Sequence, residues 1–232
     1  MKKKRSKEYQ LSPSIISADY NCLEKQFSIM KEENVKYLHL DIMDGEYVPS
    51  ICMDIPLIKS IRQKNTFVFD AHIMTTNVRK MIEELLNIDI DIISIHLEIE
   101  ESPYELIKEI KHSGKKAGIV LNPETSVKKI PEKILQLVNT VQIMSVAPGV
   151  GGQSFIRSSV EKIKQLYSIR KKMNLEFDIE VDGDVNLQNL PWILEAGANI
   201  IVSGTTLFKD DFRENIQEFY KVINDFKNNG GE

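Results

Sequence analysis

The sequence predicts a single-domain α/β protein, and within that class a (β/α)8 barrel. Short runs rich in Ile and Val alternate with amphipathic runs along nearly all of the 232 residues, and eight of each fit into the chain. No linker or low-complexity stretch interrupts the alternation, which indicates one domain. A doubly wound open sheet is the alternative. It usually has fewer strands, and the glycine-rich fingerprint expected after its first strand is absent.

Each expected strand is a short apolar run bounded by polar turns, as a buried parallel strand should be. The eight strands are expected at residues 10–16, 37–43, 67–73, 92–98, 116–122, 140–146, 177–183 and 199–205.

Helices are expected between the strands. In "SVEKIKQLYSIRKKM", for example, Val160, Ile163 and Leu166 recur at helical spacing among basic residues. Gly114 and Gly197 stand where helices should stop. The eight helical patterns cover residues 21–33, 55–63, 77–87, 102–112, 126–137, 156–172, 187–196 and 213–227.

Composition excludes several classes of protein. The chain is 42% hydrophobic and 28% charged with a net charge of −4, which gives no basic surface for nucleic acid. Cys22 and Cys52 are too few and too isolated for a disulfide framework or a thiolate metal site. No apolar run approaches the ~20 residues that span a bilayer. A cytoplasmic protein that binds neither membrane nor nucleic acid is expected.

The ends of the chain are polar. The basic start "MKKKRSKEYQ" is not followed by the apolar core of a signal peptide, so residues 1–10 are expected to form a flexible N-terminus. The barrel domain is expected over residues 11–227, and residues 228–232 as a disordered tail.

Three strands carry titratable residues on the face that lacks the large aliphatic side chains. In "YLHLDIM", Leu38 and Leu40 share one face while His39 and Asp41 share the other. The same parity holds for "FVFDAHIM", which contains Asp70, His72 and Met74, and for "FDIEVDG", which contains Asp178, Glu180 and Asp182. In a (β/α)8 barrel the C-terminal ends of the strands carry the chemistry. His39, Asp41, His72 and Asp182 are therefore expected to meet inside the barrel mouth.

Two imidazoles and two carboxylates suit a divalent transition metal such as zinc, iron, manganese or cobalt. The alternative is a set of structural, hydrogen-bonded core residues. Asp70 and Glu180, one step deeper, are expected to orient His72 and Asp182 respectively. His96 also lies near a strand end. It could line the site or be a hydrogen-bonded residue of the core, and the sequence does not decide between the two.

A second pattern indicates an anion site. "SVAPGVGGQSF" (145–155) contains three glycines whose backbone N–H groups can approach an anion. "DGDVN" and "SGTTLF" follow the seventh and eighth strands, where these barrels usually bind phosphate.

These motifs together resemble the ribulose-phosphate 3-epimerase family. "LSPSIISAD", "HLDIMDGEYVP", "DAHIM", "VLNPET", "IMSVAPGVGGQSF" and "EVDG" appear in the order and spacing of that family, from about residue 11 to residue 208. The resemblance implies a ribulose-phosphate-binding TIM barrel and an isomerase that epimerises C3 of a ketose phosphate. The implied substrate is D-ribulose 5-phosphate, converted to D-xylulose 5-phosphate. D-Allulose 6-phosphate is the alternative, and an inactive phosphosugar-binding barrel a more remote one.

The resemblance also implies residue roles. His39, Asp41, His72 and Asp182 would bind one divalent metal, and Asp41 and Asp182 would be the catalytic acid and base. The implied substrate contacts are Ser14, His72, Gly149, Val150, Gly151, Gly152, Asp182, Gly183, Asp184, Gly204 and Thr205. A homo-oligomer is also expected. This chain departs from it at Asp184, where glycine is usual, at Val150, where an aromatic residue is common, and in "SGTT".

Epimerisation next to a ketone needs a base and an acid on opposite faces of a planar enediolate. Asp41 is expected to accept the proton and Asp182 to donate one, with a metal neutralising the developing oxygens. Met43, Met74 and Met144 are expected to line the site and exclude water. An aldolase or decarboxylase barrel would instead need an inward lysine at a strand end. Lys36 and Lys116 lie at the opposite ends of their strands.

Overall fold

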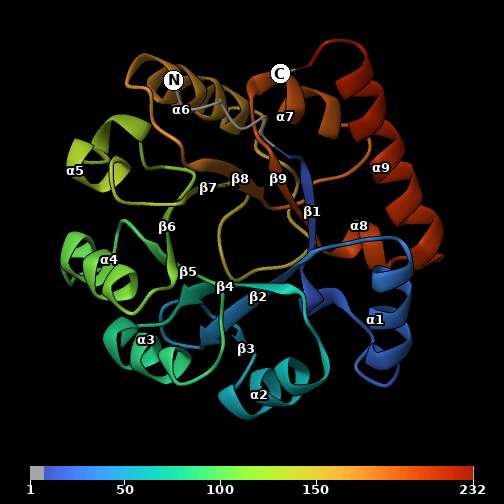
Figure 1. Ribbon diagram of the computed structural model, residues 1–232, viewed down its shortest axis with the longest axis horizontal. Coiled ribbons are helices and arrows are strands. Elements are labelled where there is room, and N and C mark those ends of the chain that lie inside the picture. The colour runs from blue at the N-terminus through green and yellow to red at the C-terminus, as the bar shows by residue number, and fades with distance from the viewer. Residues whose placement is uncertain (1–7, 232) are drawn as a thin grey trace.

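The computed structural model describes residues 8–231 of the chain. It is a closed ring of strands surrounded by helices, as Figure 1 shows. The strands are β1 (Gln10–Pro13), β2 (Tyr37–Asp44), β3 (Ile51–Cys52), β4 (Val68–Met74), β5 (Ile92–His96), β6 (Lys116–Leu121), β7 (Thr140–Met144), β8 (Asp178–Asp182) and β9 (Ile200–Ser203).

The helices form the outer layer and mostly alternate with the strands in sequence. They are α1 (Leu23–Glu32), α2 (Ile55–Lys64), α3 (Val78–Leu86), α4 (Pro103–His112), α5 (Glu132–Leu135), α6 (Ser159–Lys172), α7 (Leu190–Ala196), α8 (Thr205–Phe208) and α9 (Phe212–Asn228). Two short 3-10 helices, η1 (Ile15–Ser17) and η2 (Val127–Lys129), complete the set in the described part of the chain.

The strands pair side by side in the order β1-β9-β8-β7-β6-β5-β4-β2-β3. All neighbours are parallel except β3, which folds back antiparallel onto the end of β2. The ring closes where β1 meets β2, through one parallel bridge between Ser14 and His39. The expected single-domain (β/α)8 barrel is confirmed, with β3 as an added hairpin at its mouth.

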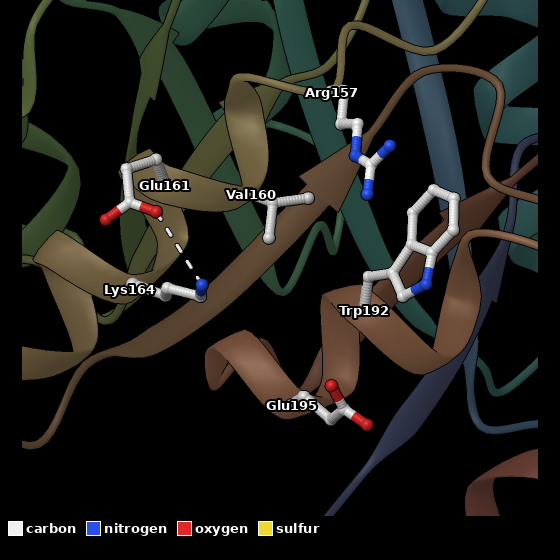
Figure 2. Close-up of a pocket in the computed structure, with 6 residues that line it drawn as sticks. All are labelled: Arg157, Val160, Glu161, Lys164, Trp192 and Glu195. Atoms are coloured by element: carbon white, nitrogen blue, oxygen red, sulfur yellow. Dashed lines mark ion pairs between the residues drawn. The ribbon is translucent and has the colours of Figure 1, made fainter.

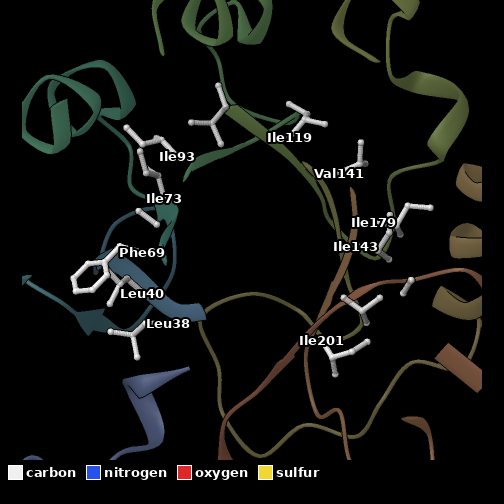
Figure 3. Close-up of a cluster of buried hydrophobic side chains, with 14 of the residues drawn as sticks. Leu38, Leu40, Phe69, Ile73, Ile93, Ile119, Val141, Ile143, Ile179 and Ile201 are labelled. Carbon is white, nitrogen blue, oxygen red and sulfur yellow. The ribbon is translucent and has the colours of Figure 1, made fainter. Parts of the chain in front are cut away.

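The main core lies between the strands and the helices. Side chains on the outward faces of the strands point toward the helices and are fully or almost fully buried (Figure 3). They include Leu38, Leu40, Phe69, Ile73, Ile93, Ile119, Val141, Ile143, Ile179 and Ile201. Because side chains alternate along a strand, this packing directs the intervening residues to the barrel interior.

Some expected elements differ. The helix predicted over 126–137 is broken into η2 and α5, because Pro131 has no N–H and holds Ile130 in an extended conformation. The first strand ends at Pro13, after which the chain turns into η1. The sequence reading missed β3 and α8, which have two and four residues and are too short to show a periodic pattern.

Both ends of the described chain are held by backbone hydrogen bonds. Gln10 already belongs to β1, where its N–H donates to the carbonyl of Asn199. At the other end Asn228 still belongs to α9, and the N–H of Gly231 donates to Phe226, so the predicted tail begins within hydrogen-bonded structure. Residues 1–7 and 232 lie outside the described residues. Within the described part, no helix is both long enough and apolar enough to span a bilayer.

Candidate metal and active site

The structure brings His39, Asp41, His72 and Asp182 together in the barrel interior. Oδ1 of Asp41 lies 3.3 Å from Nδ1 of His72 and 3.5 Å from Nε2 of His39. Oδ2 of Asp182 lies 3.7 Å and 3.8 Å from the same two nitrogens. In a tetrahedral site with bonds of about 2.1 Å, neighbouring ligand atoms are about 3.4 Å apart. The donor atoms are therefore spaced as the ligands of one metal ion would be.

Strand register explains this convergence. β2 and β4 pair in parallel with Asp41 opposite His72, so the two side chains leave neighbouring strands at one level. Asp182 ends β8 and reaches the same centre from another part of the ring. The expected convergence of the four residues holds because outward packing of Leu38, Leu40 and their equivalents fixes the register of each strand.

The donor chemistry fits a cation. Nε2 of His39 is buried and has no hydrogen-bond partner among the described residues, although it faces both carboxylates. Burial alone would lower the pKa of His39, but the charge of Asp41 and the close contacts of the ring with Asp41, Asp70 and Glu180 raise it well above its usual value. The cluster thus stabilises positive charge at this position, which a divalent metal would supply directly.

Asp70 and Glu180 contact a different residue from the ones expected. Oδ2 of Asp70 and Oε1 of Glu180 both lie 3.3 Å from Nδ1 of His39. The prediction that they orient His72 and Asp182 is therefore wrong, because register places Asp70 directly beside His39. Burial and the charge of Asp70 raise the pKa of Glu180 well above its usual value. Asp70 and Glu180 together hold the His39 ring so that its Nε2 faces Asp41 and Asp182.

His96 lines the site through His72. Its Nε2 lies 2.8 Å from Nε2 of His72, and the two rings stack with centroids 5.0 Å apart. Nδ1 of His96 faces Oε2 of Glu98 at 3.4 Å. With its proton on Nε2, where it can be donated to Nε2 of His96, His72 would have its Nδ1 lone pair available for a metal.

The two carboxyl groups sit in different electrostatic environments. Burial would raise the pKa of Asp41, but the charge of His39 and the close contacts with both imidazoles lower it far below its usual range. Burial and the charge of Asp41 raise the pKa of Asp182 to about 7. For His72, burial and the neighbouring imidazoles lower the pKa to about 4. Such divergence between paired carboxyls is typical of an acid and a base that share a reaction.

Two further polar side chains contact the cluster. Oγ of Ser14 donates to Oδ2 of Asp41 at 2.5 Å, so the residue expected to contact substrate lies against one of the two carboxylates expected to be catalytic. Nε2 of Gln142 lies 3.3 Å from Oδ2 of Asp182 and 3.3 Å from Nδ1 of His72. Sequence reasoning missed Gln142, although its parity with Met144 in "TVQIM" could have shown that it faces inward.

The three methionines are buried, as expected. Met43 and Met74 pack with Val48 in a small apolar cluster separate from the main core, with Tyr47 and Cys52 against it. Met144 contacts Gln142, with its Sδ 3.5 Å from Nε2 of that residue.

The glycine loops stand at the ends of β7, β8 and β9, where phosphate was expected. Gly149 has φ +81°, and a Cβ there would come within 2.2 Å of Val48 in the loop after β2. Gly183 has φ +122°, and a Cβ there would meet the backbone nitrogen of Val146 at 2.8 Å. Both positions require glycine, because a side chain is excluded by conformation and by space.

The other expected substrate residues occupy the same loops. Val150 is half exposed, Gly151 and Gly152 are exposed, and Gly204 precedes Thr205 at the start of α8. Asp184 has φ +47°, and its Oδ2 accepts a hydrogen bond from the N–H of Phe155, 3.2 Å away. Its carboxylate therefore joins the loop after β8 to the loop after β7.

A groove of about 280 Å³ between α6 and α7 does not belong to this site. Figure 2 shows Trp192 with the guanidinium of Arg157 over its ring, beside Val160, Glu161, Lys164 and Glu195. None of the predicted site residues lines it.

Fold and site together define an α/β-barrel enzyme with a His/Asp cluster that can hold a divalent metal and small-residue loops beside it. The model of the ribulose-phosphate 3-epimerase family matches residues 10–208. The chain belongs to this family, and it is an epimerase of the isomerase class.

Relatives support the assignment along nearly the whole chain. The chain is 38% identical to a ribulose-phosphate 3-epimerase of Synechocystis sp., over 88% of this chain and 89% of the relative. For the enzyme of the same name from Treponema pallidum, identity is 33% over 89% of this chain and 94% of the relative.

Solved structures confirm the fold. A 3-keto-L-gulonate-6-phosphate decarboxylase from Vibrio cholerae superposes with a TM-score of 0.67 at 9% identity, covering 95% of this chain and 99% of that one. A 3-hexulose-6-phosphate synthase gives 0.67 at 14% identity, over 92% of this chain and 99% of that one.

Proposed function

We propose that the protein interconverts D-ribulose 5-phosphate and D-xylulose 5-phosphate by moving the proton at C3. The observation that carries the proposal is the convergence of His39, Asp41, His72 and Asp182 at one centre of the barrel interior. Both carboxylates lie within residues 10–208, which the model of the ribulose-phosphate 3-epimerase family matches.

Two carboxylates can serve opposite faces of one planar intermediate. Asp41 comes from β2 and Asp182 from β8, so a ketose lying between them has one carboxyl on each side. Asp41 accepts the C3 proton, and Asp182 returns one to the other face. In the reverse reaction they exchange roles. Ser14 holds Asp41 by the hydrogen bond to Oδ2 and limits its rotation.

The four residues would bind one divalent transition metal, through Nε2 of His39, Nδ1 of His72 and one oxygen of each aspartate. When bound, it supplies positive charge for the enediolate oxygens. Two imidazoles favour zinc, iron, manganese or cobalt over magnesium. The buried cluster of Met43, Met74 and Val48 excludes water beside this centre.

The substrate phosphate is assigned to the loops after β7, β8 and β9. Gly149, Gly151 and Gly152 come from the first, Gly183 and Asp184 from the second, and Gly204 and Thr205 from the third. The close approach of backbone at Gly149 and Gly183 supports the assignment, because N–H groups can reach an anion where no side chain intervenes.

A panel of ketose phosphates incubated with the enzyme in D2O tests the function. Exchange at C3, followed by NMR, is expected with D-ribulose 5-phosphate and D-xylulose 5-phosphate. If only D-allulose 6-phosphate exchanged, the enzyme would act on hexuloses instead. If metal-loaded protein exchanged none of these sugars, the barrel would bind phosphosugars without acting on them.

Asp184→Gly tests the phosphate assignment. A carboxylate ~5 Å from a phosphate dianion costs roughly 3 kcal/mol per charge pair at an effective dielectric near 20, and screening reduces this severalfold. Oδ2 of Asp184 is already engaged by the N–H of Phe155, so the repulsion is expected to be mild. KM for ribulose 5-phosphate should fall severalfold or less, with kcat nearly unchanged. A much larger gain would show that Asp184 selects against this sugar.

We also propose a cytoplasmic homo-oligomer. The site is complete within one chain, so association is not needed to assemble it. Light scattering of purified protein tests the oligomeric state, since a monomer mass at working concentration would contradict it.

A further inference from the structure

Gln142 is a polar residue in a strand whose outward neighbours, Val141 and Ile143, are both apolar. It lies on the inward face of β7 and is fully buried. Its Nε2 approaches three acceptors: Oδ2 of Asp182 at 3.3 Å, Nδ1 of His72 at 3.3 Å and Sδ of Met144 at 3.5 Å.

The chemistry of these neighbours fixes the orientation of the amide. A carboxylate that binds a metal is ionised and only accepts hydrogen bonds, so the amide NH2 then faces Asp182 and the carbonyl points away. Oε1 of Gln142 then has no hydrogen-bond partner among the described residues. Burying an unsatisfied carbonyl is unfavourable, and an apolar side chain would avoid it. The residue is therefore best explained by what its NH2 group does.

The amide has two hydrogens for three nearby acceptors. A metal bound to Nδ1 of His72 would occupy the lone pair of that nitrogen. The two hydrogens would then serve Oδ2 of Asp182 and Sδ of Met144, and the second is a weak acceptor. The hydrogen bond to Asp182 is thus the one strong contact of the amide that would remain after metal binding.

We propose that Gln142 is a positioning residue that holds the metal-facing oxygen of Asp182 in place. Hydrogen bonds from such outer partners orient ligating carboxylates and strengthen metal binding. Asp182 ends its strand and is the most exposed of the four ligands, so it has the fewest packing restraints. This inference rests on the metal site of the proposed function.

The test compares Gln142→Met with Ser94→Ala. Methionine keeps the length and flexibility of the side chain but cannot donate. Ser94 is also fully buried, on β5 opposite His72 in register, and its Oγ has no partner in the described part of the chain. Affinity for Co²⁺ and Zn²⁺ is measured by chelator competition, and the visible absorption of the Co²⁺ protein reports ligand geometry.

Gln142→Met is expected to weaken Co²⁺ and Zn²⁺ binding ~10–100-fold and to change the Co²⁺ spectrum. Its kcat should fall while KM stays near the wild-type value, and Ser94→Ala should match wild type throughout. Should Gln142→Met not fold, Gln142→Asn carries the test, because its shorter stem draws the donor away from Asp182. Wild-type affinity and spectrum in the Gln142 variant would overturn the inference, as would equal losses in both variants. Failure of the wild-type protein to take up metal would instead overturn the metal site itself.

Discussion

Asp41→Asn and Asp182→Asn are each expected to abolish epimerisation while leaving the fold intact. Each aspartate supplies one face of a two-face proton transfer, and neither can substitute for the other. A general acid or base typically contributes ~10²–10⁴-fold, and the added role as a ligand should increase the loss. The measurement is kcat/KM with ribulose 5-phosphate, with circular dichroism for the fold. Asp225→Asn, on the exposed face of α9, is the control and should retain full activity.

Isotope exchange separates the two roles. Asp182→Asn still contains Asp41, so any residual C3 exchange in D2O should be seen with D-ribulose 5-phosphate, and the label should return to the same face. Asp41→Asn should show the converse, with exchange only from D-xylulose 5-phosphate. If either variant kept more than about a tenth of the wild-type rate, the two-carboxylate scheme would be wrong, since such groups contribute far more.

Removal of the metal is expected to have an effect of similar size. Purified protein should contain about one divalent transition metal per chain, because the donor set forms one shell. Treatment with a chelator should abolish activity, and zinc, iron, manganese or cobalt should restore it. Charge stabilisation by a metal is worth several kcal/mol, so the loss should exceed ~10²-fold. Elemental analysis before and after reconstitution provides the measurement.

Histidine variants locate the metal in the barrel. His39→Ala and His72→Ala should lose it, whereas His112→Ala should bind it normally. His112 is a fair control because it is exposed at the end of α4 and its Nδ1 lies near the carbonyl of Lys108. Native protein without metal, and no uptake after reconstitution, would refute the site.

The sequence predicted the barrel and the convergence of His39, Asp41, His72 and Asp182 because both depend on local patterns. Alternation along a strand separates Leu38 and Leu40 from His39 and Asp41, and no other information is needed to place the pair inside. The same rule applied to "DAHIM" and "EVDG" gives His72 and Asp182. Barrel closure then brings the strand ends together.

Contacts between side chains on different strands could not be predicted from these local patterns. Whether Asp70 lies nearer His39 or His72 depends on the register of β2 against β4, which the turn lengths and packing decide. Gln142 was overlooked because a single polar residue in an apolar run resembles an ordinary strand position. The break in the helix at Pro131 could have been predicted, since a proline inside a helical pattern ends the helix.

The closure of the barrel has a thermodynamic consequence. In the described part of the chain, the backbone of β1 pairs with β9 at four positions. With β2 it shares one backbone bridge, between Ser14 and His39, beside the hydrogen bond from Ser14 to Asp41, which makes this seam the one with the fewest backbone pairs. A metal that links β8 to β2 would span that seam from the inside. Folding and metal binding are then coupled equilibria: at a free metal concentration of 100 times Kd, the folded state gains about 2.7 kcal/mol. Loss of the metal would therefore open the barrel first between its first two strands, where hydrogen exchange of β1 and β2 should report it.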